Sequence, residues 1–354
     1  MTGILIVAAS VLIFIVIVQI ARASELVTVI KGFDRSEDNS RLHAALSLIF
    51  MVVGLIAATW SVFYYMPRFL PEAASTQGVV IDENFNITLI FTGIVFFITQ
   101  IMLFLFVYKY RQSKKRKAYY YPDNNKLEVA WTIVPAIVLT FLVVKGMTSW
   151  YVITGPEPED SLVFEATGKQ FEWVIRYPGM DGEFGQQRLD SVTPTNILGL
   201  RWADPSSKDD IISNEIHLPV NKPVAVRIRA FDVLHSFYLP HFRVKMDAVP
   251  GIPTRFWFTP TITTAQMREK LEDPEFNYEL ACAELCGRGH SSMRRVVVVE
   301  TEEEYNSWLR SQKPYYSTIS GTATNSEVNI PNPNPGMDTI SPANDIDNPD
   351  IQKN

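Results

Sequence analysis

Near the C-terminal end of the chain, twelve residues contain the types that most clearly suggest chemistry. The segment reads Cys-Ala-Glu-Leu-Cys-Gly-Arg-Gly-His-Ser-Ser-Met and holds both cysteines of the protein, Cys282 and Cys286, followed by His290 and Met293. Thiolate, imidazole and thioether groups together are the ligand set of a soft transition metal, above all copper. The spacing therefore predicts a metal site built largely on one short loop.

The second cysteine bears on the kind of copper site. A mononuclear blue-copper site uses one Cys, two His and a weak Met, so a second thiolate is surplus to it. Two thiolates can instead bridge two copper ions, each completed by one His and one weak ligand, for which Met293 and the backbone carbonyl of Glu284 are candidates. The loop has a single His, and the best candidate for the second is His235 in Asp-Val-Leu-His-Ser-Phe.

Two other interpretations remain open from the residues alone. Cys282 and Cys286 are close enough for a disulfide if the loop forms a helical turn, but too far apart if it is extended. Zinc bound by two Cys and two His is also conceivable, although the spacing is unusual for zinc and Met293 would then have no role.

Most of the apolar residues lie in the first part of the chain, in four stretches that approach the roughly 20 residues needed to cross a bilayer. These stretches are residues 1–21, 42–66, 84–108 and 129–153. The first could be a secretory signal, but no Lys or Arg precedes it, so we expect a retained helix.

The loops between these stretches predict the orientation. The segment from Lys109 to Lys126 holds seven basic residues against one acid, Asp123, which places it on the cytoplasmic side. With four spans, everything after Ile153 then lies outside the cytoplasm. Two thiols in an oxidising compartment need a disulfide or a metal, which favours the metal site.

Residues 155–310 have the pattern of a soluble all-β domain. Short runs rich in β-branched and aromatic residues occur at 162–166, 171–177, 224–231, 254–258 and 294–299. They predict a Greek-key β-sandwich. Residues 179–212 fit this pattern poorly and are interpreted as a surface insertion, and a short helix is expected from Thr301. The polar, proline-rich residues 311–354 predict a disordered tail. A net charge of −6 argues against a nucleic-acid partner.

The chain resembles subunit II of the haem–copper cytochrome c oxidases, over roughly residues 85–310. The most specific segments are Cys282 to Met293, Asp232 to Phe237, and Lys-Met-Asp-Ala-Val-Pro-Gly at 245–251. Leu-Glu-Val-Ala-Trp-Thr-Ile-Val-Pro-Ala at 127–136 is similar to the start of the second hairpin helix of that family. The resemblance implies a cupredoxin-like sandwich that carries a dinuclear copper A centre and is anchored by the transmembrane hairpin at 84–153. The helices within 1–66 are additional to this pattern.

The same resemblance implies roles for individual residues. The copper ligands would be His235, Cys282, the backbone carbonyl of Glu284, Cys286, His290 and Met293. The Glu284 side chain would reach a magnesium ion shared with the catalytic subunit, and Glu128 would match an acidic residue at a proton-channel entrance. A solvated loop carboxylate and an ordinary interfacial charge are the alternatives for these two. The segment 168–173 resembles the electron-entry patch, which makes Phe171, where a Trp is usual, and Trp173 candidates. Trp173 could instead belong to the sandwich core.

The resemblance implies the electron-entry subunit of a proton-pumping cytochrome c oxidase, part of a multi-subunit oxidoreductase. The copper pair would accept electrons from a cytochrome c, or from a cytochrome domain of a neighbouring respiratory complex. It would pass them to haem in catalytic subunit I, where O2 is reduced to water. The expected location is a bacterial-type inner membrane, with the copper domain on the periplasmic face. A nitrous oxide reductase should lack the hairpin, a quinol oxidase subunit lacks the metal ligands, and a copper carrier usually binds one Cu(I). The chain has no C-x-x-C-H motif for an attached haem.

Overall fold

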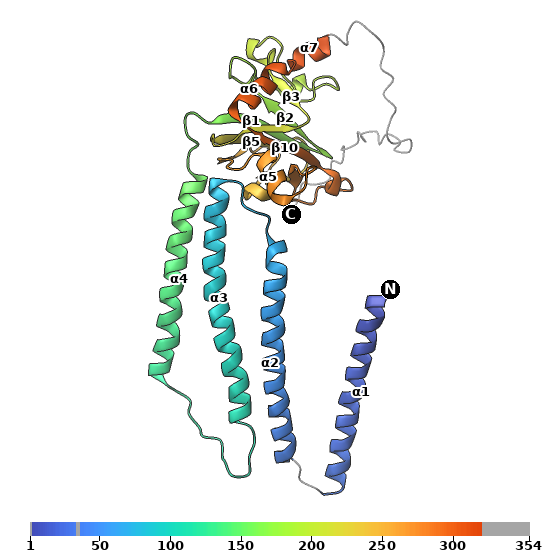
Figure 1. Cartoon of the computed structure of the whole chain (residues 1–354), viewed down its shortest axis with the longest axis vertical. Coiled ribbons are helices and arrows are strands. Elements are labelled where there is room, and N and C mark those ends of the chain that lie inside the picture. The colour runs from blue at the N-terminus through green and yellow to red at the C-terminus, as the bar shows by residue number, and fades with distance from the viewer. Residues whose placement is uncertain (1, 33–35, 321–354) are drawn as a thin grey trace, which may run out of the picture. The chain divides into compact units, whose positions relative to one another are not determined.

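Four long apolar helices precede the β-domain in the computed structural model, which describes residues 2–32 and 36–320 (Figure 1). They are α1 (Thr2–Ile30), α2 (Ser36–Phe69), α3 (Thr76–Lys109) and α4 (Asn125–Thr154). All four are long and apolar enough to cross a membrane. The prediction of four spanning helices is therefore confirmed.

Polar side chains determine where the hairpin helices begin and how they pair. Ser75 caps α3 by accepting a hydrogen bond from the backbone N–H of Gly78, and Asn124 caps α4 in the same way for Leu127. The two helices are joined by a hydrogen bond of 2.7 Å from Asn84 Nδ2 to Ser149 Oγ. A salt bridge of 3.2 Å between Glu83 and Lys145 lies beside it. These contacts make α3 and α4 a hairpin.

The β-domain consists of two five-stranded sheets with strand orders β3-β2-β1-β5-β8 and β4-β10-β9-β6-β7. The pairs β1–β5 and β10–β4 are parallel, and the pairs β1–β2, β5–β8, β6–β7, β6–β9 and β9–β10 are antiparallel. The predicted β-sandwich is confirmed, with further strands between those expected. The strands are β1 (Leu162–Lys169), β2 (Glu172–Tyr177), β3 (Ile211–Ser213), β4 (Ile216–Pro219), β5 (Val224–Ala230), β6 (His235–Leu239), β7 (Val244–Ala248), β8 (Thr254–Phe258), β9 (Tyr278–Cys282) and β10 (Arg294–Glu300).

Aromatic side chains from both sheets form the core of the sandwich. Trp173 of β2 makes an edge contact with Phe237 of β6, with ring centres 5.6 Å apart. Phe164 of β1 lies 5.7 Å from Tyr177 and 6.3 Å from Phe237. All four side chains are fully buried. The alternating aromatic residues Trp173 and Tyr177 of β2 thus point to the sandwich core, while Val174 and Arg176 on the other face of the strand are buried as well.

Two short α-helices, α5 and α6, accompany the strands of the β-domain. The helix α5 (Thr264–Leu271) begins at a capping box formed by Thr263 and Gln266. The helix α6 (Glu302–Ser311) begins at a second capping box, formed by Thr301 and Glu304, where a helix start was predicted.

Residues Pro178–Ile211 belong to a second compact unit, together with the described residues from Lys313 to Ser320. This unit contains the segment predicted as an insertion. It also contains α7 (Tyr315–Ser320), so the prediction of a disordered tail is wrong for these residues. Tyr315 is held by a hydrogen bond of 2.7 Å from its backbone N–H to Asp210 O and one of 2.8 Å from its hydroxyl to Thr195 O. The remainder of the predicted tail, 321–354, lies outside the described residues.

The linker between α2 and α3 runs along the sandwich and is hydrogen-bonded to it. Ala74 donates its N–H to His241 O at 2.7 Å, and its carbonyl accepts from Thr261 N at 2.9 Å. The Ser75 hydroxyl donates to Phe242 O at 2.7 Å. Through these bonds the start of α3 is tied to the sandwich by backbone and side-chain contacts.

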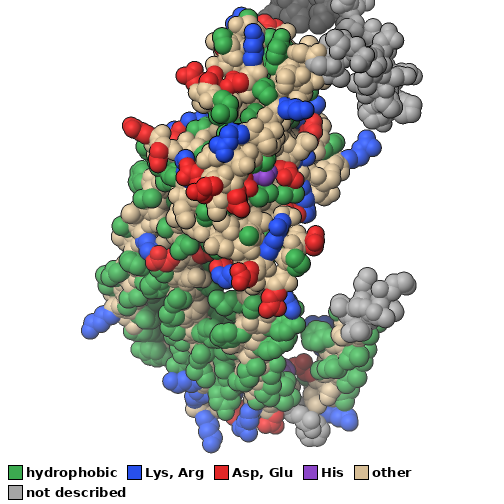
Figure 2. All heavy atoms as spheres, turned by 45° about the horizontal axis from the view of Figure 1, so that its top comes forward, with side chains coloured by type: hydrophobic (Ala, Val, Ile, Leu, Met, Phe, Trp, Pro, Cys, Tyr) green, Lys and Arg blue, Asp and Glu red, His purple; other side chains and the backbone are tan. Residues whose placement is uncertain are grey.

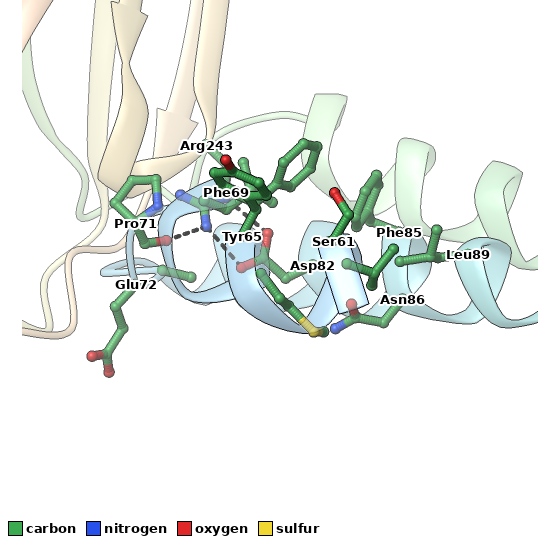
Figure 3. Close-up of a pocket in the computed structure, with 14 residues that line it drawn as sticks. Ser61, Tyr65, Phe69, Pro71, Glu72, Asp82, Phe85, Asn86, Leu89 and Arg243 are labelled. Atoms are coloured by element: carbon green, nitrogen blue, oxygen red, sulfur yellow. Dashed lines mark hydrogen bonds and ion pairs between the residues drawn. The ribbon is translucent and has the colours of Figure 1, made fainter. Parts of the chain in front are cut away.

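Arg243 strengthens this connection, as Figure 3 shows. Its guanidinium donates to both carboxylate oxygens of Asp82 on α3, at 2.8 and 2.9 Å. It also donates to the carbonyls of Pro71 and Pro240, at 2.5 and 2.7 Å. Arg243, Asp82 and Pro71 help to line a cavity of about 550 Å³ between α2 and α3. A bidentate pair of this kind gives geometric specificity as well as energy.

We predict that Arg243→Gln loosens the connection between the linker and the sandwich. The variant loses charge-assisted hydrogen bonds from a largely buried guanidinium, so the connection should weaken by about 1–3 kcal/mol. Limited proteolysis of the full chain should cut the linker at residues 70–75 faster than in the wild type.

The exposed Arg255, which pairs with Glu157 at 3.0 Å and leaves 53% of its side chain accessible, provides a matched control. Arg255→Gln should leave the cleavage rate nearly unchanged, since exposed ion pairs contribute little. Equal cleavage rates in both variants would show that Arg243 is not a connecting residue.

Candidate metal centre

The predicted ligands come from two neighbouring strands and the loop that follows one of them. His235 is the first residue of β6 and Cys282 the last of β9, and these antiparallel strands pair with Phe237 opposite Cys282. Cys286, His290 and Met293 lie between β9 and β10. A hydrogen bond of 3.2 Å from Cys282 N to Met293 O closes this loop at its base. Residues that are 58 positions apart in the chain are thereby brought together (293 − 235 = 58).

Each thiol faces one imidazole and one weak donor. Cys282 Sγ lies 3.9 Å from His235 Nδ1 and 3.2 Å from the carbonyl oxygen of Glu284. Cys286 Sγ lies 3.7 Å from His290 Nδ1 and 3.9 Å from Met293 Sδ. The two sulfurs are 4.0 Å apart. All six predicted ligand groups are thus adjacent to one of the two sulfurs.

The disulfide alternative does not agree with this geometry. Both cysteines are free, and their separation of 4.0 Å is about twice the S–S bond length of roughly 2.05 Å. The ligand atoms of His235, Cys282 and Cys286 all lie within 4.8 Å of one another, and the three residues are buried. Soft donors gathered in this way fit copper.

Burial also determines how the thiols titrate. Removal from water, with the neighbouring Cys282 as a second cause, raises the pKa of the Cys286 thiol to about 11. A metal binds the thiolate form, so binding must release this proton. The apparent affinity of the site for a metal should therefore increase with pH.

Asp232 and Gln170 hold the site from outside the ligand set. Asp232 Oδ1 lies 2.9 Å from His235 Nε2, which leaves Nδ1 directed toward Cys282. Burial alone would raise the pKa of Asp232, but hydrogen bonds from Gln170 N, His235 and Val233 N together lower it. Gln170 Nε2 also donates to the carbonyl of Cys286 at 2.6 Å. A carboxylate behind a ligating histidine orients the ring and selects its tautomer.

Sequence reasoning assigned no role to these two residues. The spacing Asp-x-x-His at 232–235 is the signal that could have identified Asp232, because it brings the carboxylate back to the ring of the ligand. Gln170 had no such signal, since it reaches Cys286 from another part of the fold.

The two aromatic candidates for electron entry differ in position. Trp173 is 0% exposed and packs against the His235 ring, with centres 6.0 Å apart. It therefore lies in the sandwich core, which was the alternative stated for it from the sequence, and a role in electron entry stays a prediction. Phe171 is 38% exposed. Its ring covers the backbone of Gly287 and Gly289, where an added Cβ would come within 2.8 and 2.4 Å of it.

The side chains of the two acidic candidates, Glu284 and Glu128, are exposed and do not belong to the buried ligand group. Glu284 is exposed on the metal loop, while its backbone carbonyl faces Cys282. Glu128 is an exposed residue in the first turn of α4, and its carboxylate lies 3.5 Å from the N–H of Asn124, the cap residue. A carboxylate at this position is favourable to the helix start in its own right.

Both parts of the chain match known sequence families. The family described as cytochrome c oxidase subunit II, periplasmic domain, matches residues 162–301. The family described as cytochrome c oxidase subunit II, transmembrane domain, matches residues 58–148. The first range contains all ten strands of the sandwich. The second contains the end of α2, all of α3 and most of α4.

Similar proteins cover most of the chain. An alternative cytochrome c oxidase subunit 2 of Bradyrhizobium diazoefficiens is 34% identical over 275 residues, which is 77% of this chain and 93% of that protein. A cytochrome c oxidase subunit 2 of Thermostichus vulcanus is 29% identical, covering 69% of this chain and 78% of that protein. Among solved structures, the periplasmic domain of subunit II of cytochrome oxidase from Bradyrhizobium japonicum is 30% identical. It covers 44% of this chain and 96% of that one, with a TM-score of 0.31. A buried His/Cys/Cys group on a sandwich that follows apolar helices, together with these matches, shows that the chain belongs to the cytochrome c oxidase subunit II family.

Proposed function

We propose that this chain is the electron-entry subunit of a proton-pumping cytochrome c oxidase and that its metal loop holds two copper ions. The proposal is supported by the division of the ligand group into two sets, each with one thiol, one imidazole and one weak donor. Cys282 has His235 and the Glu284 carbonyl beside it, and Cys286 has His290 and Met293. Two thiolates can serve both sets at once by bridging.

The residues of the chain would give such a centre a fixed geometry. When bound, the copper pair supplies one-electron transfer from a donor toward the haem of the catalytic subunit. His235 and Cys282 are held by paired strands, and Asp232 fixes the ring of His235. Trp173 and the sandwich core exclude water from one side of the site. A rigid, dry ligand set keeps reorganisation small and tunes the redox potential.

We predict two copper ions per chain when the full-length protein is loaded with copper. Metal analysis with electron paramagnetic resonance should give this count and the signal of an electron shared between two coppers. Cys286→Ser should abolish the shared signal, because one bridge is lost. Met293→Leu should keep both coppers and shift the redox potential, since the thioether is a weak ligand. Met180→Leu, at an exposed methionine outside the site, is the matched control.

Other outcomes separate the competing functions. One copper per chain would favour a membrane-anchored copper carrier, and a preference for zinc over copper would favour a zinc site. No bound metal in the wild type would favour a quinol oxidase subunit. Each of these results would overturn the two-copper proposal.

Glu284 is proposed to hold a magnesium ion at the interface with the catalytic subunit. The support is the division of roles within one residue, whose carbonyl faces Cys282 while its carboxylate is exposed. Carboxylate oxygen is the ligand type that magnesium prefers.

In the assembled oxidase, Glu284→Gln should lower the bound magnesium or manganese and slow electron transfer out of the copper site. The copper count should stay at two, because the backbone carbonyl is retained. Glu279→Gln is the control, because Glu279 is also an exposed glutamate but lies on β9, before the metal loop. Manganese binding unchanged by Glu284→Gln would contradict the proposed role.

The electron donor is proposed to be a separate protein, either a cytochrome c or a cytochrome domain of a neighbouring respiratory complex. Phe171 is the proposed contact for the donor, since it is exposed and covers the loop between Cys286 and His290. Of the two donors we favour a fixed neighbour, because the two N-terminal helices add lateral surface in the membrane.

A fixed neighbour predicts that oxidase turnover resists added salt and that the two complexes co-purify in mild detergent. Phe171→Ala should slow reduction of the copper site by the donor and leave the copper count unchanged. Leu271→Ala, at an exposed residue that ends α5, should change neither. A steep fall in turnover with salt, with the oxidase purifying alone, would instead favour a diffusing cytochrome c.

The membrane assignment is proposed to be a bacterial-type inner membrane with the sandwich on its periplasmic face. The basic loop from Lys109 to Lys126 supports this orientation. The helices within residues 1–66 are proposed to be additional to the anchoring hairpin. Glu128 is proposed to lie at the entrance of a proton channel in the assembled oxidase.

A further inference from the structure

A second site with recognisable chemistry lies at the end of α3, away from the metal loop. A cavity of about 600 Å³ is lined there by three cationic and three largely apolar side chains. The cations are Lys109, Arg111 and Arg116, and the others are Leu105, Phe106 and Tyr108. No carboxylate lines this cavity. Its walls therefore suit a molecule with an anionic group at one end and a hydrocarbon part at the other.

The loop after α3 gathers these cations by folding back on the helix end. Arg116 donates from Nη1 to Lys109 O at 2.6 Å and from Nη2 to Arg111 O at 3.2 Å. Arg111 donates from Nη1 to Tyr108 O at 2.7 Å, and its guanidinium lies over the Tyr108 ring at 4.6 Å. Each guanidinium has five N–H donors, so donors remain for a further acceptor.

The positive charge of this cavity is not neutralised within the described part of the chain. Across residues 2–32 and 36–320, Lys109, Arg111 and Arg116 form no ion pair. Glu37, which approaches the same loop, accepts hydrogen bonds from Ser113 Oγ and Lys114 N at 3.3 and 3.2 Å. Glu25 lines a neighbouring cavity with Arg111. The cluster of cations is thus available to an external anion.

The position of the cavity along α3 places it at the depth of lipid headgroups. The chain crosses the membrane along α3 and again along α4 before it enters the sandwich, so this end of α3 meets the opposite surface. Lys and Arg side chains project from the lower end of the hydrophobic helices in Figure 2. Leu105 and Phe106 lie one turn deeper than Lys109, on the hydrocarbon side. Anionic phospholipids are enriched where basic residues flank a membrane helix.

We propose that this cavity binds one anionic phospholipid. Its phosphate would lie among Lys109, Arg111 and Arg116, and an acyl chain would lie along Leu105 and Phe106. Basic residues here also orient the hairpin and cap the carbonyls at the end of α3. Neither of those roles requires that the cations share a cavity with apolar walls. Orientation depends on all the basic residues of the loop alike, whereas the carbonyl contacts involve Arg111 and Arg116 and leave out Lys109.

The loop allows two variants with equal loss of charge to be compared, one changed at the cations that line the cavity and one changed elsewhere in the loop. The test variant carries Lys109→Gln, Arg111→Gln and Arg116→Gln, and the control carries Lys115→Gln, Lys117→Gln and Lys126→Gln. Each removes three of the seven basic residues between 109 and 126, so each leaves four to orient the hairpin (7 − 3 = 4). Only the first set lines the cavity.

Full-length protein would be reconstituted with equal phosphatidylglycerol and phosphatidylcholine, and the retained lipid identified by native mass spectrometry. The wild type should retain one phosphatidylglycerol in preference to phosphatidylcholine. Each cation near an anionic surface contributes roughly fivefold in affinity, so the test variant should lose on the order of 100-fold. The control should retain the lipid within about threefold, because its residues lie outside the cavity.

Lys109→Gln alone keeps both guanidinium groups that cap the helix, and should weaken retention about fivefold without affecting the fold. Equal losses in the test and control variants would overturn the proposal, since they would indicate a general surface-charge effect. Equal retention of both lipids by the wild type would overturn it as well. Release of the lipid by millimolar inorganic phosphate would show that the site recognises a free phosphate rather than a phospholipid.

Discussion

The pairing of β6 with β9 is the constraint on which the metal site depends. It places His235, at the start of one strand, beside Cys282, at the end of the other. The hydrogen bond from Cys282 N to Met293 O then closes the loop, so Cys286 and His290 must return to the same point. A ligand set held by strand ends and a closed loop has little freedom to follow the metal. The protein thereby determines the geometry of the centre.

Contacts outside the ligand set complete this rigidity. Asp232 selects the tautomer of His235. Gln170 donates its backbone N–H to the Asp232 carboxylate and its side-chain amide to the carbonyl of Cys286. The two halves of the metal site therefore share one hydrogen-bonded network. Such a network is stable only when each buried group is satisfied, which makes the positions of these two residues as specific as those of the ligands.

The connection between the sandwich and the membrane helices is also held by several specific hydrogen bonds. The linker before α3 is bonded along the sandwich through Ala74 and Ser75, and Arg243 adds charged hydrogen bonds to Asp82. An electron-transfer domain must keep a constant distance to its acceptor. Several short contacts at the start of α3 serve this requirement better than a flexible tether would. At the other end of α3, the cations gathered around Arg116 interact with the helix carbonyls and leave donors for a lipid.

The sequence by itself determined the features that depend on local composition. The four membrane helices follow from the length of apolar runs, although α3 begins at Thr76, before the predicted residue 84. The helix start at Thr301 follows from the acidic residues of its first turn. The types and spacing of Cys282, Cys286, His290 and Met293 were enough to indicate copper. The strands β1, β2, β5, β8 and β10 were visible because they are rich in apolar, aromatic and β-branched residues.

Only the tertiary structure decided which of these residues meet. The strands β6, β7 and β9 were not predicted, although β6 and β9 carry His235 and Cys282, because their short sequences contain too little alternation to be recognised alone. The separation of the two sulfurs, the burial of Trp173 and the contacts of Asp232 and Gln170 all depend on strand pairing between distant segments. The order of residues 315–320 likewise depends on the contacts of Tyr315 with Asp210 and Thr195. Local sequence specifies the donors, but the long-range pairing that brings them together is a property of the whole fold.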